Sequence, residues 1–151
     1  MSFLVDLAAG IAREAHRGQL YGGKEDYFEA HVEKVAERVR NAGYSDKHIA
    51  VAYLHDVVED TEITLQELYD AGMPPEVVMS VEAMTHREGE SYMAYLWRAS
   101  ENKFARVVKY HDMKQNLSCN PTARQTVKYT MGIDFLSLRF PHEGFDNAGT
   151  I

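Results

Sequence analysis

The chain has a single cysteine and lacks long apolar runs, and these shortages exclude several classes of protein. With Cys119 as the one cysteine among 151 residues, neither an intramolecular disulfide nor a cysteine-based zinc site can form. No stretch approaches the roughly 20 apolar residues that cross a bilayer. The first residues also lack the basic region and the small-residue cleavage site of a signal peptide. We therefore expect a cytoplasmic protein that makes no use of a membrane.

The chain also has fewer basic than acidic residues. The sequence has 16 Lys and Arg against 23 Asp and Glu, which gives a net charge of −7 at pH 7. Because nucleic-acid polymers are held by clustered Lys and Arg, this balance argues against broad nucleic-acid binding. A small anionic substrate stays compatible with it, since acidic residues around a divalent ion are partly neutralised. We therefore expect a small-molecule partner, and the sequence leaves a homo-oligomer open.

Strand-like alternation is rare, and apolar residues recur instead at the spacing of helices. With 45% hydrophobic residues, the chain is long enough for a single domain with an adequate core. Gly, Pro and capping residues separate the periodic segments. The expected fold is a compact all-α bundle over residues 1–140, with helices near residues 3–16, 29–42, 46–58, 64–72, 74–84, 91–100, 102–118 and 122–140.

Several segments of this bundle carry more specific expectations. The loop at residues 18–28 is a candidate functional segment, because long loops in compact domains often are. The aromatic side chains of the helix at 91–100 are expected in the core, and the alternative is a surface on which a nucleotide stacks. Residues 141–151 have no periodicity and are expected to form a poorly ordered tail. The last helix is expected to pack through the apolar stripe Val127, Met131, Phe135 and Leu138.

Residues with the chemistry of metal ligands gather where the apolar run at 49–54 ends. Positions i, i+1, i+4 and i+5 share one side of a helix, so this side would carry His55, Asp56, Glu59 and Asp60. Three carboxylates so close together repel one another, and they also oppose the helix dipole at a C-terminus. A bound cation would remove both penalties, whereas the alternative is a solvated, acidic helix end. The stretch alone leaves both interpretations open.

Two other helices offer residues of the same kind. His31 lies in the first turn of the helix at 29–42, where a lone histidine is usually structural or solvated. The helix at 102–118 has Lys109, Asp112 and Asn116 on one face. These three side chains could form either a surface salt bridge or a buried polar cluster that needs partners. Each observation is ambiguous by itself.

Together, two histidines and two aspartates on three helices form a constellation suited to a metal ion. The set comprises His31, His55, Asp56 and Asp112. It could hold one divalent ion and leave positions for water and substrate. Since imidazole favours the softer ions, Mn²⁺, Fe²⁺ or Zn²⁺ suits this set better than Mg²⁺.

The order of these motifs resembles that of the HD-domain metal-dependent phosphohydrolases, in particular the hydrolase domain of RelA/SpoT homologues and small alarmone hydrolases. An HD dipeptide alone is weak evidence, but the ordered set is far more specific. The similarity covers about residues 8–118 and rests on AHRGQ at 15–19, His31, LHDVVEDT at 54–61, VKYHD at 108–112 and Asn116. The resemblance implies an all-α HD-type fold. It also implies hydrolysis of a phosphorylated nucleotide, foremost the 3′-pyrophosphate of guanosine tetra- or pentaphosphate.

The resemblance also implies a role for each matching residue. Its metal ligands would be His31, His55, Asp56 and Asp112, with Mn²⁺ as the expected ion. Glu59 and Asp60 would position and activate the attacking water, and Asn116 would contact the substrate. The candidates for neutralising the substrate phosphates are Lys24, Arg87 and Lys109.

Three departures from the family pattern leave the metal ligands complete. Tyr21 stands where the family usually has an arginine that packs against the guanine base, and Met113 replaces another family arginine. The segment YFEAHV at 27–32 stands in place of the family's Tyr-Ile-x-His-Pro. Tyrosine could stack on a base but supplies no guanidinium. Tyr21 is therefore a candidate substrate-binding residue, and guanine specificity is not implied.

Two alternatives stand beside the pyrophosphohydrolase. One is another HD enzyme, such as a nucleotidase or a phosphatase that acts on a nucleotide cofactor, with the same metal site and a different pocket. The other is a sensor that binds a nucleotide without cleaving it. The presence of Glu59 and Asp60 argues against the sensor, since a protein that only binds would not need them.

Overall fold

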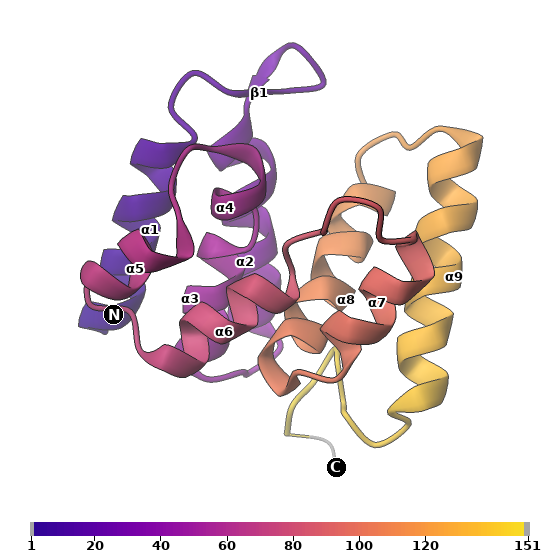
Figure 1. Cartoon of the computed structure of the whole chain (residues 1–151). Helices are drawn as coiled ribbons and strands as arrows, with labels where there is room; N and C mark the ends of the chain where they lie inside the picture. Colours follow the sequence, from indigo (N-terminus) through magenta and orange to yellow (C-terminus); the bar gives the residue numbers. More distant parts are fainter. Residues whose placement is uncertain (1, 150–151) are drawn as a thin grey trace.

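The computed structural model describes residues 2–149, and helices make up nearly all of its regular structure (Figure 1). The strands in this part of the chain, β1 (Leu20–Tyr21) and β2 (Glu25–Asp26), form a short antiparallel hairpin. The expected all-α bundle is therefore confirmed. No described helix is long and apolar enough to cross a membrane. The helices are α1 (Phe3–Ala15), the π-helix η1 (Phe28–Val32), α2 (Glu33–Asn41), α3 (Asp46–Leu54), α4 (Val57–Asp60), α5 (Leu65–Asp70), α6 (Pro75–Ala83), α7 (Tyr92–Ser100), α8 (Lys103–Leu117) and α9 (Ala123–Arg139).

Helix α3 forms the centre of the larger hydrophobic core. Ser45 caps its N-terminus, and every residue from Ile49 to Leu54 is buried. The helix contacts α1, α2, α6 and α8, so neighbours surround it. Removing a leucine side chain such as that of Leu54 from water contributes roughly 1.5–3 kcal/mol to stability. Because α3 is buried on all sides at its C-terminal end, His55 also lies in the interior.

Two helix irregularities determine where the candidate metal ligands lie. The expected helix over residues 46–58 is interrupted at His55 and Asp56, between α3 and α4. The expected helix over 29–42 begins as the π-helix η1, which contains His31. A π-helix closes i→i+5 hydrogen bonds, is rare, and often lies at a functional site. Simple helical periodicity predicts neither irregularity.

Helices α7, α8 and α9 enclose a second, smaller core. Leu96 and Leu136 are fully buried there. Gly132 permits the close approach of α9 to α8, because a Cβ atom at this position would lie 2.4 Å from the Sδ atom of Met113. Helix α9 lies at one edge of the molecule (Figure 1), and its main neighbour is α8.

Much of the apolar stripe expected to pack α9 faces solvent. Val127, Met131 and Leu138 are 59%, 59% and 82% exposed, so the prediction is wrong for these residues. Phe135 is partly buried, and its ring lies 5.8 Å from that of Trp97, which is itself half exposed. Helix α9 packs mainly against α8, so only a narrow strip of its surface is buried. Helical spacing identifies apolar residues on a face, but it does not identify the face that a neighbour covers.

The tail packs against α8, contrary to the expectation of a poorly ordered segment. The Phe145 and Tyr110 rings stack with their centroids 4.6 Å apart. The Nε2–H of His111 donates to the carbonyl of Phe145 at 2.8 Å. The expectation is therefore wrong for residues 141–149, because one aromatic side chain supplies enough apolar surface to dock a short segment. Residues 150–151 lie outside the described part of the chain.

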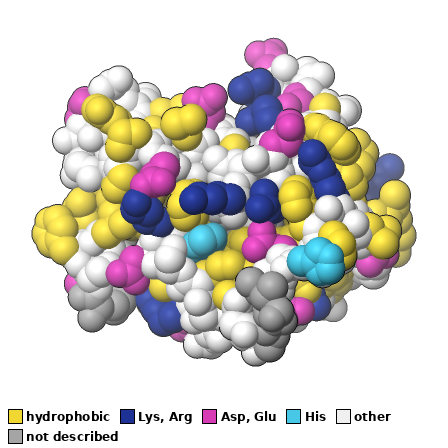
Figure 2. Space-filling model, turned by 90° about the horizontal axis from the view of Figure 1, so that it is seen from below, with side chains coloured by type: hydrophobic (Ala, Val, Ile, Leu, Met, Phe, Trp, Pro, Cys, Tyr) yellow, Lys and Arg dark blue, Asp and Glu magenta, His cyan; other side chains and the backbone are white. Residues whose placement is uncertain are grey.

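Charged side chains are mixed on the face of the molecule that Figure 2 shows. Lys and Arg side chains lie in a row across this face, and Asp or Glu side chains lie next to several of them. Arg106 also pairs with Glu143 and Arg98 pairs with Glu90, at 2.7 and 2.8 Å. Part of the positive charge is therefore neutralised within the protein. The expectation that the chain binds no nucleic-acid polymer stays a prediction.

Replacing Phe145 by alanine is expected to lower the free energy of unfolding by about 3 kcal/mol, near the lower end of the cost of buried Phe→Ala changes. The tail would lose its stacking contact with Tyr110. Urea unfolding followed by circular dichroism measures the change. Leu138→Ala, at an exposed position of α9, is the control and should stay within about 0.5 kcal/mol of the parent protein. Equal effects of the two variants would contradict a docked tail.

Candidate metal centre

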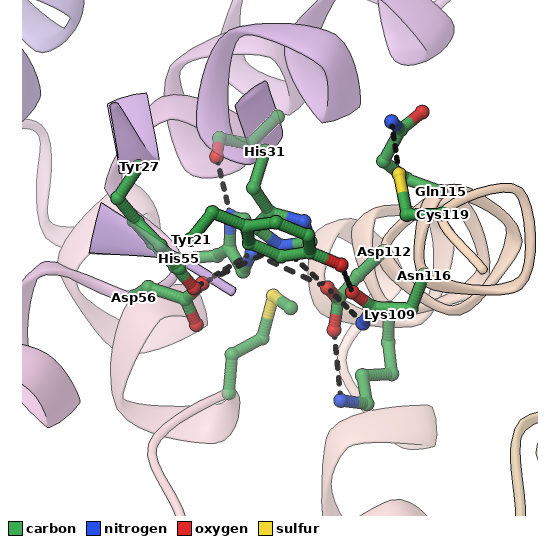
Figure 3. Close-up of polar contacts among 12 residues, drawn as sticks. Tyr21, Tyr27, His31, His55, Asp56, Lys109, Asp112, Gln115, Asn116 and Cys119 are labelled. Atoms are coloured by element: carbon green, nitrogen blue, oxygen red, sulfur yellow. Dashed lines mark hydrogen bonds and ion pairs between the residues drawn. The ribbon is translucent and has the colours of Figure 1, made fainter. Parts of the chain in front are cut away.

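Two imidazoles and two carboxylates meet in the interior where η1, the end of α3 and α8 come together (Figure 3). The Nε2 atom of His31 lies 2.9 Å from Oδ1 of Asp112 and 3.6 Å from Oδ2 of Asp56. The Nε2 atom of His55 lies 3.0 Å from Asp56 and 3.6 Å from Asp112, through the same oxygens. Ligand atoms of His31, His55 and Asp112 all lie within 4.8 Å of one another. This cluster could hold a metal ion.

The hydrogen bonding of His55 supports a metal-binding orientation. Its Nδ1–H donates to the backbone carbonyl of Ala52 at 2.6 Å, so Nε2 of the neutral ring carries a lone pair. This Nε2 is buried and makes no hydrogen bond within the described residues. It faces two carboxylates, which also carry lone pairs. A divalent cation fits between these lone pairs, because imidazole nitrogens and carboxylate oxygens are ligands that transition metals accept.

The electrostatics of the cluster favour a bound positive charge. Burial disfavours the charged form of His55, but Asp56 and Asp112 outweigh burial and raise its pKa well above the usual value. Burial likewise opposes ionisation of Asp56, but His55 lowers the pKa of that carboxyl to about 2. Both shifts mean that the carboxylates attract a cation strongly. A proton on His55 and a bound metal ion are two alternative sources of this positive charge.

Neighbouring side chains hold the two carboxylates in place. The Tyr27 hydroxyl donates to Oδ2 of Asp56 at 2.5 Å, and the Lys109 ammonium donates to Oδ2 of Asp112 at 2.9 Å. The amide of Asn116 donates to the other oxygen of Asp112 at 3.3 Å. Burial opposes the charge of Asp112, but Lys109 outweighs this and keeps its pKa well below the usual value. Tyr27 is a supporting residue that the sequence analysis did not single out.

Glu59 and Asp60 lie on α4, beside this cluster. The Glu59 carboxylate accepts a hydrogen bond from the backbone N–H of His86 at 2.7 Å, and Asp60 accepts one from Gln19 at 3.3 Å. Partial burial raises the pKa of both carboxyl groups, and the charge of Asp56 raises both further. A carboxylate with a raised pKa is a better proton acceptor than an ordinary one.

A cavity of about 570 Å³ opens onto the cluster. Its polar side includes Asp56, Glu59 and Asp112. The cavity continues along α7 and α9, and the remaining lining residues are His86, Glu90, Tyr92, Tyr95, Lys109, Asn116, Lys128 and Tyr129. A second groove, of about 810 Å³, lies between α1 and residues 61–67 and contains none of the metal-ligand candidates. The cavity of about 570 Å³, which is lined by two of the metal-ligand candidates, is therefore the candidate substrate pocket.

The structure brings some of the expected substrate-binding residues together and leaves others apart. Lys109 and Asn116 line the cavity. The Tyr21 ring stacks on His31 with centroids 5.6 Å apart, and its hydroxyl donates to Oδ1 of Asn116 at 3.1 Å (Figure 3). Lys24 is exposed between β1 and β2, and exposed Arg87 lies 3.6 Å from Glu82. Neither Lys24 nor Arg87 is among the residues that line the cavity.

Helices α7 and α9 also contribute to the cavity, which helical spacing in the sequence does not predict. Tyr95 is buried as expected, but it also lines the cavity, and Tyr92 is only partly buried beside it. Lys128 and Tyr129 are neighbours on α9 that enter the cavity wall. The partly polar face of α9 is a weak signal, because lysine and tyrosine are common on solvated helix surfaces.

Comparison with known proteins gives consistent matches. A family model described as "HD domain" matches residues 8–118. The chain is 26% identical over 152 residues to "GTP pyrophosphokinase rsh" of Brucella melitensis biotype 1, an alignment that covers 93% of this chain and 20% of that protein. The chain thus spans about a fifth of the length of this curated relative. A solved structure described as "A metazoan ortholog of SpoT hydrolyzes ppGpp and plays a role in starvation responses" matches with a TM-score of 0.71 at 19% identity, over 92% of this chain and 96% of the other, which shows a shared fold.

Replacing Tyr27 by phenylalanine is expected to weaken Mn²⁺ binding about 10- to 100-fold, because a hydrogen bond that orients a ligand carboxylate is lost. Isothermal titration calorimetry measures the affinity. Tyr69→Phe, which removes an exposed hydroxyl on α5, is the matched control and should leave the affinity unchanged. An unchanged affinity in Tyr27→Phe would show that Asp56 is not oriented by this contact or is not a ligand.

Proposed function

The chain belongs to the HD domain family, and from this premise we propose that it is a metal-dependent phosphohydrolase that acts on guanosine tetra- or pentaphosphate as a 3′-pyrophosphohydrolase. The observation that carries the proposal is the cluster of histidine and aspartate side chains that opens onto a cavity with a carboxylate of raised pKa in its wall. The solved structure supports the substrate class, since its description names a SpoT ortholog that hydrolyses ppGpp. The description of the curated relative names a GTP pyrophosphokinase, which also acts on a guanine nucleotide.

We assign the metal site to four side chains and expect Mn²⁺, with Fe²⁺ and Zn²⁺ as alternatives. The ligands would be His31, His55, Asp56 and Asp112. The ion, when bound, supplies Lewis-acid chemistry and lowers the pKa of a water from its bulk value of about 15.7. Tyr27 and Lys109 hold the two carboxylates by hydrogen bonds and would keep them oriented for an ion.

Glu59 is the proposed general base. Its carboxylate is anchored by the His86 N–H and lines the cavity, so one oxygen can accept a proton from the attacking water. A general base of this kind typically contributes about 10²- to 10⁴-fold to the rate. Asp60, held by Gln19, would position the water or Glu59. The water oxygen bonds to the phosphorus on the 3′ oxygen, the P–O bond to the ribose breaks, and the ribose oxygen takes up a proton.

Substrate binding would use the residues beside the metal ligands. Lys109 offers a positive charge for the phosphates, and Asn116 offers an amide. Tyr21 would stack on the base or the ribose once the substrate enters, because its ring already covers His31. Lys24 and Arg87 remain candidates only if the substrate extends beyond the cavity. A different HD enzyme, acting on another nucleotide or on a nucleotide cofactor, is the second candidate, since Tyr21 lacks the guanidinium of the family arginine.

The protein loaded with Mn²⁺ is expected to release pyrophosphate from guanosine tetraphosphate, and a chelator should abolish the release. A panel with ordinary nucleotides and NADPH, assayed for phosphate and pyrophosphate, tests metal dependence and substrate class together. Phosphate release from another member of the panel, with guanosine tetraphosphate intact, would favour the second candidate. Binding of guanosine tetraphosphate without turnover of any substrate would instead indicate a sensor.

The double change Glu59→Gln with Asp60→Asn is expected to lower kcat by about 10²- to 10⁴-fold, because the water loses its proton acceptor. Mn²⁺ affinity should be retained, since neither residue is a proposed ligand. The matched control is Glu62→Gln with Asp70→Asn, which removes two exposed carboxylates outside the cavity. Undiminished turnover in the first variant would exclude Glu59 and Asp60 from the chemistry.

A further inference from the structure

The wall of the cavity that α9 contributes contains a cation with no assigned role. Lys128 lines the cavity together with Tyr92 of α7 and its neighbour Tyr129. Helix α8 lies between α9 and the α3–α4 region that carries His55 and Glu59 (Figure 1). A ligand that fills the cavity therefore extends from the metal-ligand cluster toward Lys128.

Lys128 differs from Lys109, the other lysine of the cavity wall, in its partners. The ammonium of Lys109 forms an ion pair with Asp112 at 2.9 Å. Lys128 has no carboxylate within 4.0 Å among residues 2–149, and its ammonium lies 4.4 Å from the centre of the Tyr92 ring and 5.5 Å from that of Tyr129. The faces of aromatic rings attract a cation but do not use its N–H groups. These donors remain available to an anion.

The other charges of the cavity leave Lys128 as its unpaired cation within the described residues. Glu90 is paired with Arg98 through hydrogen bonds of 2.8 and 2.9 Å, so it does not serve as a counterion for Lys128. Burial, and next the positive charge of Lys109, lower the pKa of Lys128 below its usual value. Asp112 and Glu59 partly oppose this shift, but neither carboxylate forms an ion pair with Lys128. A cation held among aromatic rings near another cation, with no carboxylate in contact, is an arrangement that an anionic ligand would stabilise.

We propose that Lys128, held over Tyr92, forms a second phosphate subsite that binds the 5′ phosphates of a nucleotide whose 3′ phosphates react at the metal-ligand cluster. This inference rests on the proposed function and goes further, because it names the residue that selects nucleotides phosphorylated at two separate positions. The subsite binds substrate and transition state alike, since the 5′ phosphates do not change during the reaction. Its loss therefore raises KM and leaves kcat nearly unchanged.

The test compares two substrates that differ only in the 5′ phosphates: guanosine tetraphosphate and guanosine 3′-diphosphate. In Lys128→Gln, KM for guanosine tetraphosphate is expected to rise about 10- to 100-fold, which is the usual contribution of a hydrogen bond to a charged group. Values of kcat, and KM for guanosine 3′-diphosphate, should stay close to those of the parent protein. Lys128→Arg should restore most of the affinity because it keeps the charge. An equal change in KM for both substrates, or no change for either, would overturn the subsite.

The matched control is Lys103→Gln. Lys103 also lies over an aromatic ring, that of Phe104 at 5.0 Å, but it is outside the cavity. Its replacement should leave both KM values unchanged.

Direct binding of guanosine 5′-diphosphate, measured by calorimetry with Mn²⁺ present, separates this inference from the proposed function. Weaker binding to Lys128→Gln than to the parent and Lys103→Gln proteins supports the subsite even if guanosine tetraphosphate is never cleaved. Equal binding to all three proteins refutes the subsite even if cleavage occurs.

Discussion

The structure depends on the burial of two imidazoles against two carboxylates in the interior of a helical bundle. His31, His55 and Asp112 are almost fully buried, and burial of charge is costly unless the charges are paired. The surrounding contacts reduce that cost: Lys109 pairs with Asp112, and Tyr27 donates to Asp56. Helices from distant parts of the chain must meet at this cluster to provide those partners. The fold and the candidate site are therefore stabilised by the same contacts.

The sequence alone predicts the all-α class and the ligand set, because both leave local signals. Apolar residues at helical spacing predict most helices. The HD pair after a fully apolar run leaves a solvated helix end open, and only its combination with His31 and Asp112 predicts the ligand set. The interruption at His55 and the π-helix around His31 could not be predicted, since each depends on contacts with other helices. Likewise, the docking of Phe145 on Tyr110 joins segments whose contact no periodicity indicates.

The basic residues show the limits of sequence analysis most clearly. Lys109 was identified because it shares a helix face with Asp112, and the two are in contact. Lys24 and Arg87 are candidates from their positive charge alone, but both side chains are exposed outside the cavity. Lys128 gave no signal, because its importance comes from Tyr92 on another helix. Spacing along one helix predicts which residues share a face, whereas the partner across the cavity has to be seen in three dimensions.

Gly132 has no side chain, and this affects how α9 and α8 pack beside the cavity. A β-carbon at this position would lie 2.4 Å from the Met113 sulfur, so either the methionine side chain or the two helices would have to shift. Lys128 and Tyr129 lie one turn before Gly132, so the close packing at this glycine supports the cavity wall that they form. A position outside the cavity lining therefore contributes to the placement of its wall.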